Sequence, residues 1–130
     1  MISSALLTVA VILVLAILLL LAVFQVALAA GAPWGRLAWG GQHRVLPRRL
    51  RIGSAASVAI YALIALVVLD RAGRIDVVPD LFARIAMWVV FAYFVIGIVM
   101  NALSKSRLER SVMVPVTILL AAASLAVALS

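Results

Sequence analysis

The sequence predicts an all-α membrane protein, folded as a single bundle of four transmembrane helices over residues 1–130. Four long apolar runs alternate with three short polar connectors, which is the pattern of a multi-pass protein. Hydrophobic residues make up 68% of the chain and charged residues only 12%, whereas soluble domains carry about 25% charged residues. The mean hydropathy is +1.35. Too little polar sequence remains to coat a water-soluble globule, so the bilayer must be the solvent for much of the surface.

The composition also excludes several kinds of chemistry. The chain has no cysteine, which rules out disulfides, thiolate metal sites and cysteine nucleophiles. One histidine and four acids leave little for a metal cage, so we expect neither a metal nor another cofactor. A net charge of +7 would suggest nucleic acid in a soluble protein. Here the cations lie in short loops between apolar runs, so we expect anionic lipid headgroups as partners and no nucleic acid.

The first span is predicted at about residues 5–30, where no charge occurs in 26 positions. This exceeds the roughly 20 residues that cross the hydrocarbon, so the helix must tilt or protrude. A cleaved signal peptide is the alternative, because Ala27, Leu28 and Ala29 have the small-x-small form of a cleavage site. The basic start is missing and the apolar run is too long, which favours a retained span.

The second span is predicted at about residues 52–69, after a break that contains Pro33. Gly53, Ser57 and Tyr61 recur every four positions and therefore share one helix face. Small residues on such a face permit close approach of a neighbour.

The third span is predicted at about residues 81–103, with Pro79 just before its start. Tyr93, Gly97 and Asn101 form a second four-residue stripe of small and polar side chains.

The fourth span is predicted at about residues 112–129, with Pro115 in its first turn, where a missing N–H costs little. Its alanine-rich second half has the smallest side chains of any span, so we expect it to pack most tightly. Small-residue faces on the second and fourth spans also predict a homo-oligomer or a place in a larger membrane complex.

The distribution of cations predicts the orientation in the membrane. The first and third connectors carry eight (Arg36, Arg44, Arg48, Arg49, Arg51, Lys105, Arg107 and Arg110), and the opposite side carries three (Arg71, Arg74 and Arg84). By the positive-inside rule the first and third connectors are cytoplasmic and both termini lie outside.

The first connector, Gly31–Ile52, is the candidate binding site. It contains closely spaced tryptophans, glycines and cations, and the residues assigned to a ligand or lipid headgroup are Trp34, Arg36, Trp39, Gly40, Gly41, His43, Arg44 and Arg48. Glycines let a ligand approach the backbone, indoles settle at the membrane interface and arginines pair with phosphate. The alternative is an interfacial half-helix that Trp and Arg anchor without any specific ligand.

No catalytic residue is assigned. His43 is the natural candidate for a general base, but no acid is close to it in sequence. Asp70, Asp76 and Asp80 belong to the other side of the bilayer in the predicted topology, which weakens any acid–histidine pair.

Four polar side chains are expected inside the membrane, namely Gln25, Tyr61, Tyr93 and Asn101. Polar groups in mid-membrane usually form hydrogen bonds between helices, worth roughly 1 kcal/mol each. For Tyr61 and Tyr93 we expect packing in the interior, with contact to a ligand as the alternative. Gln25 and Asn101 could instead bond to each other, bond to the first connector or line a small cavity. No Asp, Glu, Lys or Arg lies in the middle of a span, which disfavours proton- or cation-coupled transport.

Three segments carry a resemblance: AAGAPWG (residues 29–35), AWGGQHRVLP (residues 38–47), and Asn101 to Pro115 with its pattern of Asn, Ser, Glu, Arg and Pro. The chain resembles small four-span membrane proteins of high-GC bacteria, a group with no assigned activity. The resemblance implies the inner (plasma) membrane of a bacterium but supplies neither a site nor a substrate. We expect a non-catalytic accessory subunit that binds lipid or a partner. The alternative is a membrane-embedded enzyme or transporter for a lipid-like substrate.

Overall fold

The computed structural model describes residues 2–130, and within them the chain forms four long helices and no strand. The long helices are α1 (Ser4–Ala29), α2 (Arg48–Arg71), α3 (Asp80–Ala102) and α4 (Arg107–Leu129). Two short 3₁₀ helices, η1 (Gly35–Leu37) and η2 (Trp39–Gly41), lie between α1 and α2. All four long helices have the length and hydropathy needed to cross a membrane. The predicted fold class, an all-α bundle with four spans, is therefore confirmed.

Two helices begin well before the predicted spans. α2 begins at Arg48 rather than near residue 52, and α4 at Arg107 rather than near residue 112. Arginine is a good helix former, and each start has a residue suited to it. Pro47 precedes α2, and the Ser106 hydroxyl caps α4 by accepting from the Glu109 N–H at 3.2 Å. Hydropathy marks the edge of the hydrocarbon, whereas these helices continue past that edge into the basic region.

The earlier start of α4 changes the position of Pro115. This residue lies inside the helix, eight residues after Arg107, and not in its first turn. The prediction for Pro115 was therefore wrong. A proline there has no N–H to donate to the carbonyl of Ser111, so one interior hydrogen bond of α4 is missing.

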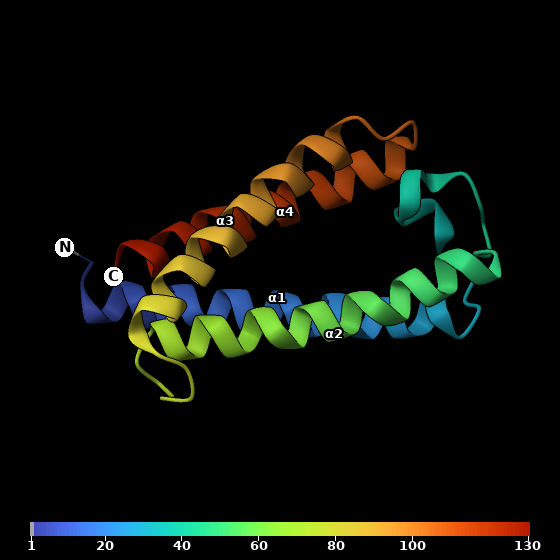
Figure 1. Cartoon of the computed structure of the whole chain (residues 1–130). Helices are drawn as coiled ribbons and strands as arrows, with labels where there is room; N and C mark the ends of the chain where they lie inside the picture. The colour runs from blue at the N-terminus through green and yellow to red at the C-terminus, as the bar shows by residue number, and fades with distance from the viewer. Residues whose placement is uncertain (1) are drawn as a thin grey trace.

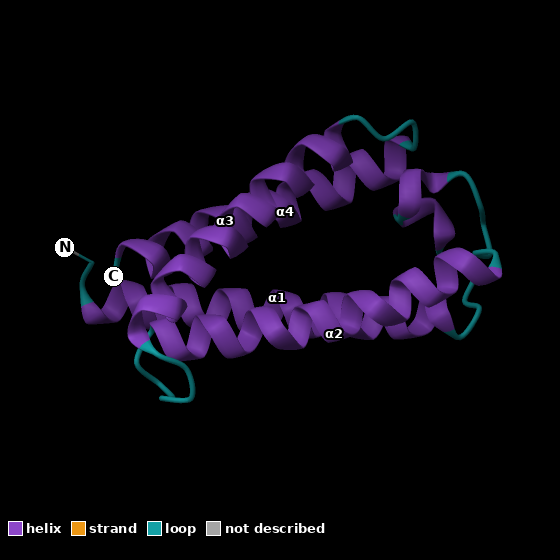
Figure 2. Cartoon of the chain, in the orientation of Figure 1, coloured by secondary structure: helices purple, strands orange, loops and turns teal. Residues whose placement is uncertain are grey.

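The helices form two antiparallel pairs, α1 with α2 and α3 with α4 (Figure 1). The pairs meet at the end of the bundle that holds both chain termini, here called the termini end, and diverge toward the opposite end. The connector between α1 and α2, residues 30–47, and the turn at residues 103–106 lie at that opposite end, here called the connector end (Figure 2). The main core includes the fully buried Val14, Val68, Met87 and Val127, one from each helix.

Polar contacts fasten the termini end. The Asp70 carboxylate accepts from the backbone N–H groups of Val77 and Val78 at 2.8 and 3.0 Å, which orders the turn after α2. Arg74 donates to the Thr8 hydroxyl at 2.7 Å, and Arg71 donates to the Ser130 carbonyl. These contacts tie the turn to α1 and the end of α2 to α4.

α4 is the most buried of the four helices, as its small side chains predicted. Ala121, Ala123, Ser124 and Ala128 are all buried within the chain itself. The alanine-rich face of α4 is therefore used for packing inside the bundle rather than displayed to a second copy. The homo-oligomer remains a prediction, and α4 no longer provides an argument for it.

Two hydroxyls on α4 predict opposite effects on stability. Ser124 is fully buried and its Oγ has no hydrogen-bond partner among residues 2–130. Thr117 Oγ1, in contrast, accepts from Asn101 at 2.9 Å and donates to the Met113 carbonyl at 2.6 Å. An unpartnered buried hydroxyl costs about 1–3 kcal/mol and a satisfied one contributes about 1 kcal/mol. Ser124→Ala should therefore keep or raise the thermal unfolding midpoint in detergent, and Thr117→Val should lower it. Equal destabilisation by both variants would contradict the assignment.

Candidate functional site

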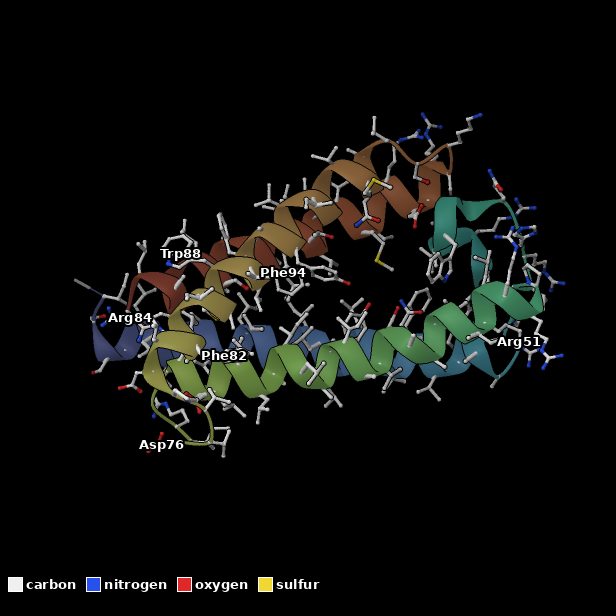
Figure 3. All side chains as sticks on the ribbon, viewed as in Figure 1. Arg51, Asp76, Phe82, Arg84, Trp88 and Phe94 are labelled. Atoms are coloured by element: carbon white, nitrogen blue, oxygen red, sulfur yellow. The ribbon has the colours of Figure 1, made fainter. Side chains whose placement is uncertain are left out.

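A cavity of about 730 Å³ lies between the two helix pairs at the connector end. All four helices and the connector contribute to its wall, which includes Phe24, Leu50, Phe94, Met100, Met113 and Leu120 among its apolar residues. Figure 3 shows Phe94 pointing from α3 toward the space between the pairs. Protein interiors are normally close-packed, with few voids larger than a water molecule. A hollow of this size falls in the range of small-molecule sites and is the candidate binding site.

Polar groups line the same cavity. Gln25 Nε2 donates to the Tyr61 hydroxyl at 3.2 Å, and Asn101 Nδ2 donates to Thr117 Oγ1 at 2.9 Å. The first bond joins α1 to α2 and the second joins α3 to α4, so interhelical hydrogen bonding is confirmed for Gln25, Tyr61 and Asn101. Tyr93 is not part of either bond and is 43% exposed, so the expectation that it packs in the interior was wrong. Gln25 and Asn101 do not bond to each other; both line the cavity, which was one of the alternatives. Gln25 Oε1 is buried and has no hydrogen-bond partner in the described part of the chain.

The two predicted stripes form much of the polar wall. Ser57 and Tyr61 line the cavity from α2, and Tyr93, Gly97 and Asn101 line it from α3. The four-residue spacing therefore identified the correct helix faces. These faces border the hollow, and at Gly97 the α3 face also packs closely on α4, where an added Cβ would lie 3.1 Å from Thr117 Cγ2.

Trp39 is held at the cavity by α2. Its indole Nε1 donates to the buried Ser54 hydroxyl at 3.0 Å, and a Cβ added to Gly53 would lie 2.9 Å from two carbons of the ring. The small residue at position 53 therefore permits close approach of the Trp39 side chain, not of a neighbouring helix backbone. Trp39 has a φ of +53°, which is rare for a bulky residue and needs support from its surroundings. The ring contacts with α2 provide that support.

Gly40 links the connector to α4. Its backbone N–H donates to Glu109 Oε1 at 3.2 Å, and Glu109 is only 6% exposed although it is a carboxylate. Ser106 and Glu109 have the S-x-x-E spacing of a capping box, in which the acid usually returns to the N–H of its own cap. Here the Ser106 N–H donates to Ser104 Oγ at 3.1 Å instead, leaving Glu109 available to the connector.

Glu109 is the main residue of the site that the sequence did not suggest. It lines the cavity together with two cations, Arg49 and Lys105, which are exposed at the connector end. The S-x-x-E pattern was the available signal, but it indicates a helix start and not a contact with a segment 69 residues away.

Two of the eight predicted headgroup-binding residues line the cavity and six do not. Trp39 and Gly40 line the cavity. Trp34 stacks on Phe24 at the connector end, with ring centroids 6.5 Å apart, and is half exposed. Gly41 is buried against Ser106, where an added Cβ would lie 2.2 Å from Ser106 Cβ.

The other four predicted residues, like Trp34 and Gly41, lie outside the cavity wall. Arg36 donates to the Gly41 carbonyl at 2.9 Å, which holds the connector together. Arg44 and Arg48 are exposed on the same end of the bundle. His43 is half-buried and does not border the cavity, so the structure gives no support to His43 as a base acting there. Arg51 of α2, labelled in Figure 3 at this end, donates to the Ala29 carbonyl at 2.9 Å and joins α2 to the end of α1.

Within residues 2–130, no group of three or more His, Cys, Asp or Glu side chains is placed to hold a metal ion. The charged groups on the cavity wall are Arg49, Lys105 and Glu109. The arrangement can therefore receive an amphipathic molecule with its charged part at the connector end and its apolar part along the helices.

The fold and the cavity define a multi-pass, all-helical membrane protein with a hollow between two helix pairs. Comparison with known proteins finds no family model, no curated protein and no solved structure that matches this chain.

The position of Trp39 predicts a steric requirement at Gly53. In a background where Trp39 is the sole tryptophan (Trp34→Phe and Trp88→Phe), Gly53→Val should displace the indole because a side chain at that position collides with it. Valine is no worse than glycine in a helix, so any effect must be steric. We expect red-shifted Trp39 emission and stronger quenching by acrylamide. Ala56→Val, at an exposed position of α2, is the control; equal emission and quenching in the two variants would show that α2 does not hold the ring.

The contact between Glu109 and Gly40 predicts a difference between two substitutions. Glu109→Gln keeps an acceptor oxygen for the Gly40 N–H, whereas Glu109→Ala removes it. A hydrogen bond to a charged group contributes about 1.5–3 kcal/mol, so exchange of the Gly40 amide should accelerate about tenfold or more in Glu109→Ala. Hydrogen–deuterium exchange of a connector peptide measures this. Unchanged exchange in the alanine variant would disprove the link.

Proposed function

We propose that the protein is a non-catalytic lipid-binding subunit of a bacterial inner membrane, which holds the headgroup of an anionic lipid in the cavity at the connector end. The observation that carries the proposal is the cavity itself. It has apolar walls, two cations at one end and hydrogen-bonding side chains between them. The hollow of about 730 Å³ opens at the charged end of a membrane bundle, where lipid headgroups and chains can reach it.

The distribution of charge supports an anionic headgroup. Arg49 and Lys105 border the cavity, and Arg44, Arg48 and Arg107 are exposed on the same end of the bundle. Each cation near an anionic membrane surface contributes about 1 kcal/mol of attraction. The same cations support the orientation in which this end is cytoplasmic and both termini lie outside.

A binding role accounts for the cavity groups better than the alternative of an enzyme. Glu109, the one carboxylate on the wall, already accepts the Gly40 N–H and thereby fixes the connector. Tyr61 and Asn101 are likewise engaged by neighbouring helices. These bonds shape the cavity wall, and the exposed cations at its mouth supply attraction for the headgroup.

Lipid selectivity tests the proposal. Native mass spectrometry of the purified protein, incubated with equal amounts of phosphatidylglycerol and phosphatidylcholine, should show preferential retention of phosphatidylglycerol. The double variant Arg49→Gln/Lys105→Gln should lower that preference about fivefold or more, since each cation contributes about 1 kcal/mol. Arg84→Gln, exposed at the termini end, is the charge control.

A second pair of variants tests the cavity by volume. Ser57→Leu fills part of the hollow at little other cost, because the Ser57 hydroxyl bonds only within its own helix, to the Gly53 carbonyl. It should reduce retained lipid, whereas Ala59→Leu on the exposed face of α2 should not. Equal retention of both lipids by every variant would contradict the proposal. A chemically altered lipid in the spectrum would favour the enzyme instead.

A further inference from the structure

A second hollow lies on the boundary between α2 and α3, toward the termini end. It has a volume of about 360 Å³, and nearly all of its wall is apolar. The lining residues are Ile60, Leu63, Ile64 and Val67 from α2, and Phe82, Ile85, Ala86, Val89 and Val90 from α3. Several of these side chains, among them Leu63 and Val89, are more than half exposed at the bundle surface. Figure 3 shows Phe82 at the start of α3 beside α2. We call this hollow the apolar groove.

The apolar groove lies beyond the cavity along the same two helices, and the two hollows share no lining residue. On α2, the cavity wall includes Tyr61 and the groove wall includes Ile60 and Ile64. On α3, Val90 lines the groove and Tyr93, one turn further, lines the cavity. The polar side chains all border the cavity, so the wall changes from charged to polar to apolar along one direction. That sequence matches a molecule with one charged end and one hydrocarbon chain.

The length of this path points to the kind of chain. Hydropathy places the edge of the hydrocarbon near residue 52 of α2, and residue 67 lies 15 positions further, which corresponds to about 22 Å along the helix axis. A typical helix tilt of about 20° reduces this depth only slightly, to about 21 Å. The hydrocarbon of one leaflet is about 15 Å thick, half of the whole core. A chain that starts at Arg49 and fills the apolar groove therefore passes the midplane of the bilayer.

We infer that the ligand is a phosphate-bearing lipid with a single hydrocarbon chain longer than one leaflet, the chemical class of the long-chain prenyl phosphates. Its headgroup lies at Arg49 and Lys105, and its chain follows α2 and α3 into the apolar groove. This inference rests on the proposed function and adds the class of lipid. The bilayer interior is as apolar as the groove, so the groove gains nothing from the hydrophobic effect and acts through packing. Affinity then comes from the cations, and the groove selects the chain.

Photo-crosslinking tests whether headgroup and chain belong to one molecule. The probe is a long-chain prenyl phosphate with a diazirine at the far end of the chain, incorporated with the intact protein into phosphatidylcholine vesicles. After irradiation, peptide mapping should place the label on groove residues such as Phe82, Ile85 and Val89. Arg49→Gln/Lys105→Gln should reduce that label about fivefold or more, although the cations lie at the other end of the path.

Two further measurements complete the test. A short prenyl phosphate with the same end label should react with cavity residues such as Tyr93 and Ile96 and leave the groove unlabelled. Ala86→Phe fills the groove and should block long-chain labelling there, whereas Ala92→Phe, exposed outside both hollows of the same helix, should not. Groove labelling that persists unchanged in the double cation variant would overturn the inference, because the chain would then arrive separately from the opposite leaflet.

The two proposals fail in different ways. If phosphatidylglycerol is not preferred over phosphatidylcholine in the mass spectra, the proposed function is wrong and the inference falls with it. If that preference holds while long and short probes label the same residues, only the chain-length inference is wrong.

Discussion

The shape of the molecule depends on one constraint: an ordered connector is bonded to both helix pairs at the end where they diverge. Trp39 is fixed to α2 through the Ser54 hydroxyl, and Gly40 is fixed to α4 through the Glu109 carboxylate. Two consecutive residues thus contact helices on opposite sides of the hollow. A small additional core of Leu28, Ala38 and Leu46 secures the connector to the end of α1. The connector consequently keeps the pairs at a set separation.

The surrounding hydrocarbon explains why such contacts decide the architecture. Lipid tails are as apolar as leucine, so apolar burial does not draw helices together in a membrane as it does in water. Close packing and hydrogen bonds determine which helices meet. At the termini end, buried Val14, Val68, Met87 and Val127 pack together, and polar contacts fasten the adjoining turn. At the connector end the corresponding space is left as the cavity.

Sequence reasoning recovers the fold because hydropathy and helix periodicity are local properties. The four spans and the shared faces of Ser57 with Tyr61 and of Tyr93 with Asn101 all follow from spacing along single helices. The distance between the α2 face and the α3 face cannot be predicted from spacing along single helices. It depends on contacts such as the one between Gly40 and Glu109, which are 69 positions apart. For the same reason Trp39 and Trp34 look equivalent in sequence, yet only Trp39 borders the cavity. Hydropathy also does not predict the helix starts at Arg48 and Arg107, because these helices extend into the polar region where hydropathy falls.

The central claim is that the connector holds the helix pairs apart, and distance measurement by pulsed electron paramagnetic resonance tests it directly. The chain has no native cysteine, so pairs of spin labels can be placed cleanly. One pair, at exposed Ile52 of α2 and Leu103 after α3, reports on the connector end, and a second pair, at exposed Leu66 and Ile85, reports on the termini end. Three attachments are removed with Trp39→Ala, Glu109→Ala and Ser106→Ala, the last because the Ser106 hydroxyl donates to the Arg36 carbonyl at 2.6 Å. This triple variant should shorten or broaden the first distance distribution and leave the second unchanged. A first distribution that stays as narrow and as long as in the parent protein would show that the connector does not set the separation of the pairs.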